Sequence, residues 1–305
     1  LPSTAVCSCL SMWRNTADTL SRDTGIRINL KNKYVSSPSD ILHMVEMQLI
    51  KIFNEEKNSE NSVLLEYKPQ AIYKLAKFIA GDIKRSASVG IAGETASGKS
   101  TIALDIIDTI ELFAGVFHID SVITRVNTDD YYYDRSEMVK KAGGMAEFAK
   151  TYDFDVPEAL ELDLMYKHIN ELLSGKSVML PKYDMSGTTI RWDNHTLAKP
   201  SKIIISEGLF TLTDKIKDAF DFKIYVDIDS DIQKERFYVR ANERGLGESA
   251  HKIYENASDK AKIYIRPTRS YADIVLSGEA QRSGYKIFLN KILSVVENIY
   301  FSKQV

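Results

Sequence analysis

The chain has 305 residues, of which 44% are hydrophobic and 27% are charged, which is typical of a globular protein with one large domain or two smaller ones. Its 40 Lys and Arg residues nearly balance 42 Asp and Glu residues, and the formal charge of −2 gives no overall field that would attract nucleic acid or an anionic membrane. We therefore expect neither partner, and any anion site must be built locally.

Residues 1 to about 36 show no sustained hydrophobic period and contain both cysteines of the chain, Cys7 and Cys9. These thiols are too few and too close together for a disulfide framework or a tetrahedral metal site. The opening LPSTAVCSCLSMW lacks the basic start of a secretory signal, and no apolar run approaches the roughly 20 residues that span a bilayer. We expect a peripheral arm on a reduced, cytoplasmic protein.

Two helices are predicted before residue 86. Apolar residues recur at helical spacing from Ile41 to about Phe53, and a second helical pattern, from about Pro69 to Lys84, follows the polar loop 54–62. We interpret residues 1–85 as a partly helical N-terminal extension of unknown role. Such an extension leaves room for a homo-oligomer or a regulatory contact.

From Ser86 onward short apolar runs alternate with helical patterns. Strands are expected at SVGIA, SVITRVN, KIIIS and FKIYVDI, and helices from about Lys99, from about Pro157, after FKIYVDI and from about Tyr285 to Phe301. This alternation indicates βαβ units on a mostly parallel sheet.

The segment from Gly93 to Ser100 reads GETASGKS and matches the pattern G-x-x-x-x-G-K-[ST] between a predicted strand and a predicted helix. Glycines let the backbone of such a loop aim its N–H groups at phosphates, beside the positive end of a helix. Lys99 would reach the β- and γ-phosphates of ATP, and Ser100 would ligate Mg²⁺. The alternative, a chance match, is disfavoured by the flanking elements. The expected nucleotide-binding residues are Gly93, Glu94, Thr95, Ala96, Ser97, Gly98, Lys99, Ser100 and Thr101.

With this loop the fold class becomes specific. We predict an α/β fold of the P-loop NTPase type, with three layers and a mostly parallel sheet flanked by helices, over residues 86–305. The helical N-terminal region is added to it.

Carboxylates follow two of the predicted strands. Asp129 and Asp130 come after SVITRVN, and Glu207 ends KIIIS, which places them at the carboxyl edge of a parallel sheet. Phosphoryl transfer to an alcohol uses a carboxylate that accepts the hydroxyl proton and Mg²⁺ on the phosphate oxygens, and either aspartate could serve. A turn or a water-facing Glu is the plain alternative. We expect Ser100, Asp129 and Glu207 to hold the metal.

A basic segment lies between about residues 234 and 266. Arg236, Arg240 and Arg244 stand four apart, so a helix would carry all three on one face, and Gly245 and Gly247 follow as candidate hinges. The guanidinium groups could close over a triphosphate and neutralise charge during transfer. The alternative is a solvated helix face paired with neighbouring Glu residues. We interpret the segment as a lid whose arginines take part in catalysis together with Lys99.

Eight segments, in order, resemble the uridine kinase and phosphoribulokinase family, and within it the uridine–cytidine kinases. They span about residues 86–300 and read GIAGETASGKST, TDDYY, YDFDVPEALELD, GKSVMLPKYD, IIISEGLF, YVDIDSD, the Arg-bearing lid and RPTRSYAD. The resemblance implies transfer of the ATP γ-phosphate to the 5′-hydroxyl of a pyrimidine nucleoside, with Asp129 in the position of the base. It also implies a substrate site in which Asp155 binds ribose and in which Tyr132, Tyr183 and Arg191 take part.

The resemblance breaks at two places. After PKYD the family's base-contacting His is replaced by MSGTTIR, with Thr188 and Thr189 at its place, and the lid reads RANERG instead of the family's Arg-Asp before Arg-Gly. A kinase for another alcohol, such as pantothenate, glycerate or a sugar phosphate, therefore stays open. So does a nucleotide-binding regulatory protein that has lost its acceptor. A nucleic-acid-acting ATPase ranks last, because neither a basic surface nor a second motor domain is present.

Overall fold

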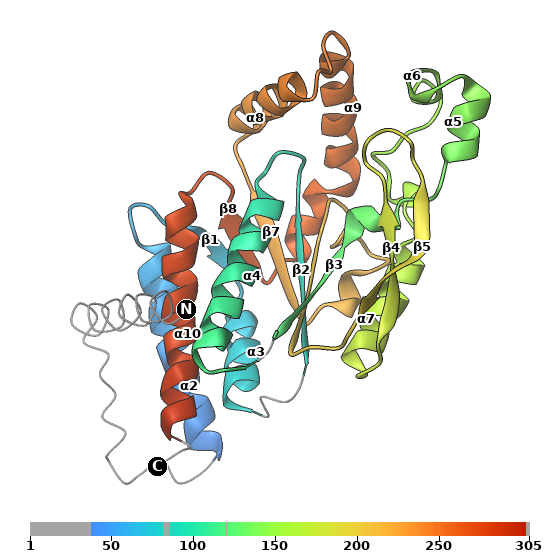
Figure 1. Ribbon diagram of the computed structural model, residues 1–305. Coiled ribbons are helices and arrows are strands. Elements are labelled where there is room, and N and C mark those ends of the chain that lie inside the picture. The colour runs from blue at the N-terminus through green and yellow to red at the C-terminus, as the bar shows by residue number, and fades with distance from the viewer. Residues whose placement is uncertain (1–37, 82–85, 120, 303–305) are drawn as a thin grey trace, which may run out of the picture.

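The computed structural model describes residues 38–81, 86–119 and 121–302, and in them a central sheet lies between two helical layers (Figure 1). The six strands follow the order β1-β8-β7-β2-β6-β3. All neighbours pair in parallel except β1, which pairs antiparallel with β8. Their bounds are β1 Leu64–Tyr67, β2 Ala87–Gly93, β3 Ile123–Asn127, β6 Ile203–Glu207, β7 Phe222–Asp227 and β8 Ile274–Ser277. The predicted α/β class with a mostly parallel sheet is confirmed.

Alternate residues of the strands face different hydrophobic clusters, because successive side chains of a strand point to opposite faces. Ile91, Ile205 and Val226 pack in one cluster with helices α2 Pro38–Lys57, α3 Pro69–Ala80, α4 Lys99–Val116 and α10 Arg282–Ser302. Ala92, Ile204 and Tyr225 pack in the other cluster with α7 Leu162–Leu173. The two clusters form the two sides of the core.

The described residues also form four further α-helices and a hairpin. The helices are α5 Ser136–Ala142, α6 Met145–Phe148, α8 Ser230–Glu243 and α9 Ser249–Tyr264, and the hairpin pairs β4 Val178–Tyr183 with β5 Arg191–Ala198. In Figure 1, α8 and α9 stand above the turn that joins β2 to α4. None of the described helices is long and apolar enough to cross a membrane.

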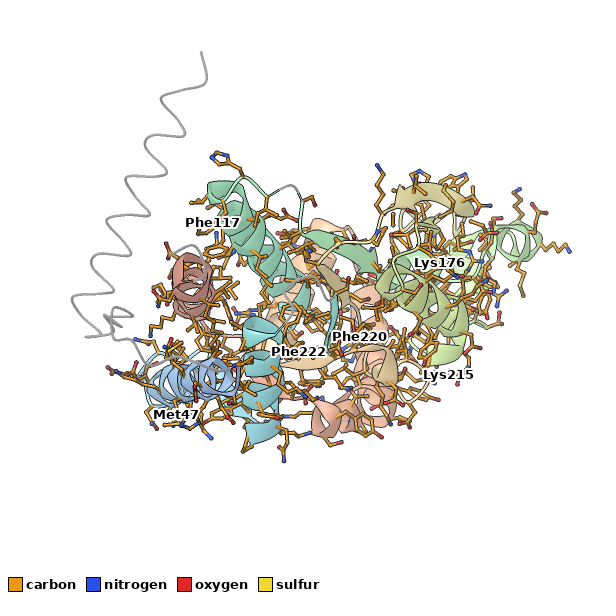
Figure 2. The ribbon with its side chains drawn as sticks, turned by 90° about the horizontal axis from the view of Figure 1, so that it is seen from below. Met47, Phe117, Lys176, Lys215, Phe220 and Phe222 are labelled. Atoms are coloured by element: carbon orange, nitrogen blue, oxygen red, sulfur yellow. The ribbon has the colours of Figure 1, made fainter. Side chains whose placement is uncertain are left out.

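Aromatic side chains pack at the end of the molecule that lies at the bottom of Figure 1. Figure 2 views it from below, with Phe220 and Phe222 near the middle of the molecule and Met47 at its edge. Phe220 is 3% exposed, and its ring lies so close to β2 that a Cβ at Gly90 would meet it at 2.6 Å. Only glycine therefore fits at position 90 without a shift.

The predicted elements need several adjustments. The helix expected from about Pro157 begins at Leu162, because Pro157–Ala159 form a 3-10 turn and Leu160 makes a β-bridge with Tyr132. Helix α3 ends at Ala80 rather than near Lys84, with Gly81 at its C-cap. Strands β1 and β8 and the β4–β5 hairpin were not predicted, and the arm expected before residue 37 lies outside the described residues.

The first described segment is not packed apart from the rest. Val45, Leu49 and Phe53 of α2 share one cluster with Ile91, Ile205 and Phe288, and β1 adds an edge strand to the sheet. A domain boundary near residue 85 stays a prediction, and it would have to cut through this cluster.

Candidate functional site

The phosphate loop connects the end of β2 with the start of α4. Gly98 caps α4 in the left-handed conformation with a φ of 92°, and Ala96 has a φ of 60°, which is unusual for a residue with a side chain. At Gly93, an added Cβ would meet the Ser97 Oγ and the Val226 carbonyl oxygen, each at 2.7 Å. The glycines of the motif therefore stand where the backbone turns sharply or passes close to its neighbours.

Lys99 and Ser100 leave this loop toward a pair of acids. The Lys99 Nζ donates to the Glu94 carbonyl oxygen at 3.3 Å, and its pKa is lowered by burial and raised in part by the charges of Asp129 and Glu207. The Ser100 hydroxyl donates to Glu207 at 2.9 Å. Glu207 is 4% exposed and is held on its other oxygen by Arg125 at 2.8 Å.

The structure distinguishes the two neighbouring aspartates. Asp130 accepts the Tyr183 backbone N–H at 3.2 Å and pairs with Lys182 at 3.1 Å, so it ties the β4–β5 hairpin to the loop after β3. Asp129 lies among the site charges instead. Burial raises its pKa, the charge of Lys99 lowers it, and Glu207 and Asp130 raise it further. Asp129 therefore interacts with the charges around the phosphate loop, whereas Asp130 is engaged by the hairpin.

The lid is bound to the phosphate loop by polar contacts. From α8, Arg240 donates to the Thr95 hydroxyl at 2.6 Å and Gln233 donates to the Thr95 carbonyl oxygen at 2.8 Å. Arg266, just after α9, forms two bonds with Glu94, at 2.8 and 3.2 Å. The side chains of Glu94 and Thr95 thus contact the lid.

The three predicted lid arginines are not equivalent. Arg236 donates to the Gly278 carbonyl oxygen at 2.7 Å, and Arg240 reaches the loop as described. The pKa of Arg240 is lowered by burial and by the like charge of Arg244. Arg244 itself is exposed at the C-cap of α8. The geometry therefore brings Arg236 and Arg240 to the loop and leaves Arg244 at the rim.

An aromatic compartment adjoins Asp129. The rings of Tyr132 and Tyr183 lie 5.3 Å apart, and Phe154 lies 6.2 Å from Tyr132. Asp129 and Asp155 both raise the pKa of Tyr132, although burial of the phenol is the larger cause. Tyr132, Tyr183 and Asp155, which the sequence assigned to one substrate site, are thus brought together.

Asp155 is held by the lid rather than by its own loop. Asn256 of α9 donates to Asp155 and to Asp153, at 3.2 Å in both cases, and Lys260 pairs with Asp153 at 2.8 Å. Burial raises the pKa of Asp155, and the Asn256 hydrogen bond lowers it in part. A substrate hydroxyl that took the place of Asn256 would donate a hydrogen bond to this partly desolvated carboxylate.

Arg191 forms ion pairs beside the aromatic compartment. Its side chain is 10% exposed and pairs with Glu161 at 2.8 Å and with Asp193 at 2.7 Å, while its third contact is to the Tyr132 carbonyl oxygen at 3.5 Å. These contacts join β5 to the Tyr132 segment.

Thr188 and Thr189 stand at the place of the family's base-contacting His. Thr188 donates to Asp184, and Thr189 is 2% exposed with a φ of 57°.

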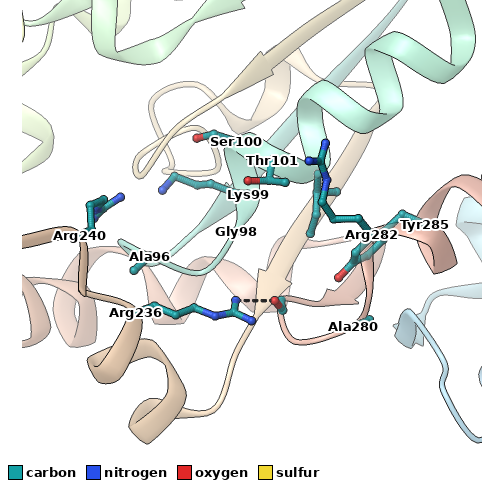
Figure 3. Close-up of a pocket in the computed structure, with 12 residues that line it drawn as sticks. Ala96, Gly98, Lys99, Ser100, Thr101, Arg236, Arg240, Ala280, Arg282 and Tyr285 are labelled. Atoms are coloured by element: carbon teal, nitrogen blue, oxygen red, sulfur yellow. Dashed lines mark hydrogen bonds between the residues drawn. The ribbon is translucent and has the colours of Figure 1, made fainter. Parts of the chain in front are cut away.

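A cavity of about 410 Å³ opens beside the phosphate loop (Figure 3). Its lining comes from the loop, from α8 and from the connection between β8 and α10. The lining residues include Lys99, Ser100, Arg236, Arg240, Arg282 and Tyr285. Figure 3 shows Lys99 and Arg240 at one end, with Arg282 and Tyr285 at the other.

The donor atoms fit a magnesium–nucleotide complex. Ser100 and Glu207 offer oxygens 2.9 Å apart at the start of α4, and hard oxygen ligands are what Mg²⁺ takes. No group of three His, Cys, Asp or Glu side chains within the described chain forms a metal cage. Mg²⁺ usually completes its shell with water and substrate phosphates.

Sequence reasoning missed several residues that build the site. Arg125, Gln233, Asn256 and Arg282 received no role, since each acts across a separation in sequence that no local pattern reports. Arg266 stands in the segment RPTRSYAD, so the family resemblance marked its neighbourhood without assigning its contact to Glu94.

A phosphate loop joins β2 to α4, and the mostly parallel sheet lies between two helical layers. Together these features define a P-loop nucleotide-binding protein. Residues 88–282 match the model of the Phosphoribulokinase / Uridine kinase family. The chain belongs to this family.

Relatives described as uridine kinases are similar over most of their length. The protein from Clostridium perfringens is 34% identical over 219 residues, which cover 70% of this chain and 98% of the relative. A Vibrio vulnificus relative is 36% identical over 192 residues, with 62% and 85% covered. The solved structure of phosphoribulokinase from Rhodobacter spheroides is 16% identical, with 64% of this chain and 70% of that chain covered and a TM-score of 0.48.

Proposed function

We propose that this protein is an ATP-dependent phosphotransferase that moves the γ-phosphate of ATP to the 5′-hydroxyl of a pyrimidine nucleoside. One observation carries the proposal. The charge of Asp129 acts on Lys99 and Arg240 beside the phosphate loop and also on Tyr132 in the aromatic compartment. A carboxylate between a phosphate site and a second compartment is placed to accept the proton of an alcohol that attacks the terminal phosphate.

The proposed transfer divides the work among the residues of this chain. The loop backbone and Lys99 hold the phosphates, and Ser100 and Glu207 hold Mg²⁺, which neutralises phosphate charge when it is bound. Arg240 adds positive charge where the transferred group passes. Asp129 orients the acceptor hydroxyl and takes its proton. Contacts of the lid with Glu94 and Thr95 would hold the lid over the loop and limit the access of water during transfer.

The residues of the aromatic compartment support a nucleoside as the phosphate acceptor. Tyr132 and Tyr183 are buried rings 5.3 Å apart that would pack against a planar base, and Asp155 would accept hydrogen bonds from two adjacent ribose hydroxyls. Thr188 is engaged with Asp184 at the place of the family's base-contacting His. A neutral hydroxyl gives the base a weaker contact than an imidazolium would, so we expect loose discrimination among pyrimidines.

The test compares kcat/KM for uridine, cytidine and their 2′-deoxy forms, with ATP and Mg²⁺, against pantothenate and glycerate. Losing the bonds from the diol to Asp155 should lower kcat/KM of the 2′-deoxy forms at least about tenfold. Asp155→Asn should narrow that ratio, whereas Asp163→Asn, an exposed residue on α7, should leave it unchanged. Phosphorylation of a non-nucleoside alcohol alone would leave only a metabolite kinase, and ATP binding with no acceptor would favour a regulatory protein.

A further inference from the structure

A buried carboxylate lies one turn beyond the phosphate loop. Asp105 of α4 has a side chain that is only 1% exposed, and Arg282 at the start of α10 donates two hydrogen bonds to it, at 2.9 and 2.6 Å. Lys286, one turn further along α10, approaches the same carboxylate at 3.6 Å. These contacts fix the edge of the Arg282 guanidinium. Its side chain remains 65% exposed, so its remaining surface can meet a ligand.

That exposed surface faces the cavity at a defined end. Arg282 and Tyr285 line the cavity opposite Lys99 and Arg240 (Figure 3). In the proposed transfer Asp129 accepts the proton of the acceptor hydroxyl, and Asp129 interacts with Lys99. The terminal phosphate, which that hydroxyl attacks, therefore belongs at the Lys99 end. The part of the donor nucleotide that reaches Arg282 is then its nucleoside portion. The Tyr285 hydroxyl donates to the Ser277 carbonyl oxygen, which leaves its ring to the cavity.

We propose that Arg282 contacts the nucleoside portion of the donor nucleotide, with its guanidinium plane against the base, and that Asp105 is the positioning residue that holds it there. The inference rests on the proposed function, because it takes ATP as the occupant of the cavity. A guanidinium is planar and stacks on aromatic rings, and two parallel hydrogen bonds to a carboxylate fix the orientation of that plane. Orientation before binding lowers the entropy lost when the ligand arrives.

A purely structural link between α4 and α10 is the competing explanation. These helices already pack through Ile102, Ala103 and Phe288, which lie in one hydrophobic cluster. Lys286 also brings a compensating charge to Asp105 without lining the cavity. A link that served stability alone would not need an arginine of α10 whose side chain also lines the cavity. Lys286 therefore gives a matched control, since it shares the carboxylate but not the cavity.

The experiment is calorimetric titration of MgADP into the full chain and its variants. Arg282→Ala should weaken ADP binding about tenfold, in the range expected for a desolvated cation against an aromatic ring. Lys286→Ala should stay within about twofold of the parent protein. The double variant Asp105→Asn with Arg282→Ala leaves no buried charge unpaired, and it should bind ADP as weakly as Arg282→Ala. Asp105→Asn alone should give a smaller loss in the same direction.

Turnover separates contact from general damage. With the acceptor at saturation, Arg282→Ala should raise KM for ATP about tenfold and leave kcat and the acceptor KM within about twofold, because the contact exists in both ground and transition states. Equal ADP affinity of Arg282→Ala and Lys286→Ala would overturn the inference, as would a fall confined to kcat. If the parent protein does not bind MgADP, the proposed function itself fails, which is a different result.

Discussion

At the scale of single residues, Lys99 is the cation that the phosphate loop supplies. Its Nζ donates to the Glu94 carbonyl oxygen at 3.3 Å, and burial lowers its pKa while the charges of Asp129 and Glu207 raise it in part. We expect Lys99→Ala to lower kcat by orders of magnitude, because electrostatic stabilisation provides most of the catalysis of phosphoryl transfer. Lys176→Ala changes an exposed lysine that is labelled in Figure 2 and lies outside the phosphate loop; this variant is the control and should turn over normally. Near-normal turnover of Lys99→Ala would contradict the assignment of the loop.

Asp129 and Asp130 provide a second comparison between neighbours. Asp129→Asn should abolish transfer and keep ATP affinity within a few-fold, because the amide keeps the shape but lacks the basic oxygen. Asp130→Asn should lower activity less, since its carboxylate serves the Tyr183 backbone N–H and Lys182. The measurements are kcat and the ATP dissociation constant of both variants. Loss of transfer in Asp130→Asn alone would move the catalytic base by one residue.

The same carboxylate sets a pH dependence. Burial raises the pKa of Asp129, and the base must be ionised to accept a proton, so kcat/KM should fall as the pH drops through the raised pKa. That fall should begin at a higher pH than for an ordinary aspartate, whose pKa is about 3.9. A pH profile of the parent protein checks this. A profile that stays flat down to the ordinary aspartate range would exclude Asp129 as the titrating group.

At the scale of elements, the lid is built from α8 and α9, which meet at Gly245 and Gly247 with φ values of 69° and 54°. Its hold on the loop is polar and exchangeable, through Arg240 and Gln233 on Thr95. Hydrogen exchange in α8 should slow when an unreactive ATP analogue and an acceptor bind together, because closure protects backbone amides. Helix α7, which lies outside the lid, should exchange unchanged. Equal exchange in α8 with and without ligands would argue against closure.

The sequence predicted the elements whose signal is local. The loop pattern predicted a strand just before Gly93 and a helix from about Lys99. Strand β2 ends at Gly93 and α4 begins at Lys99, because the glycines and the start of the helix belong to one local pattern. Strand β1 was missed because it has four residues, and its partner β8 lies about two hundred residues away. Its identity depends on tertiary contact, which a local period does not carry.

The candidate site residues likewise divide into those that the sequence could identify and those whose contacts depend on distant parts of the chain. Tyr132, Tyr183 and Asp155 came from the family resemblance and do lie in one compartment, whereas the contact of Asn256 with Asp155 spans 101 positions. Arg191 was expected to bind substrate, and its contacts are with Glu161, Asp193 and the Tyr132 carbonyl oxygen. Spacing identified which side chains could do chemistry. It did not report which of them face each other across the lid and the hairpin.

At the scale of the whole molecule, the segment from α2 to α3 shares its packing with the phosphate-loop side of the sheet. Phe53 of α2 is 1% exposed and meets Phe288 of α10 edge-to-face at 5.1 Å, in a cluster that also holds Ile102 of α4. Helices α4 and α10 both contribute residues to the lining of the cavity. Loss of packing at Phe53 should therefore reach the nucleotide site through shared unfolding.

This coupling gives a test of the domain boundary. Phe53→Ala removes a buried ring and should lower the free energy of unfolding by about 3–5 kcal/mol, whereas Met47→Ala, 52% exposed on the same helix, should change it by less than about 0.5 kcal/mol. Urea unfolding is followed by circular dichroism and, in parallel, by loss of MgADP binding. If residues 38–302 unfold as one unit, both probes shift together in Phe53→Ala with an unchanged slope, since two-state unfolding gives coincident transitions. If residues 1–85 form a separate domain, circular dichroism separates into two steps and the MgADP transition stays where it was.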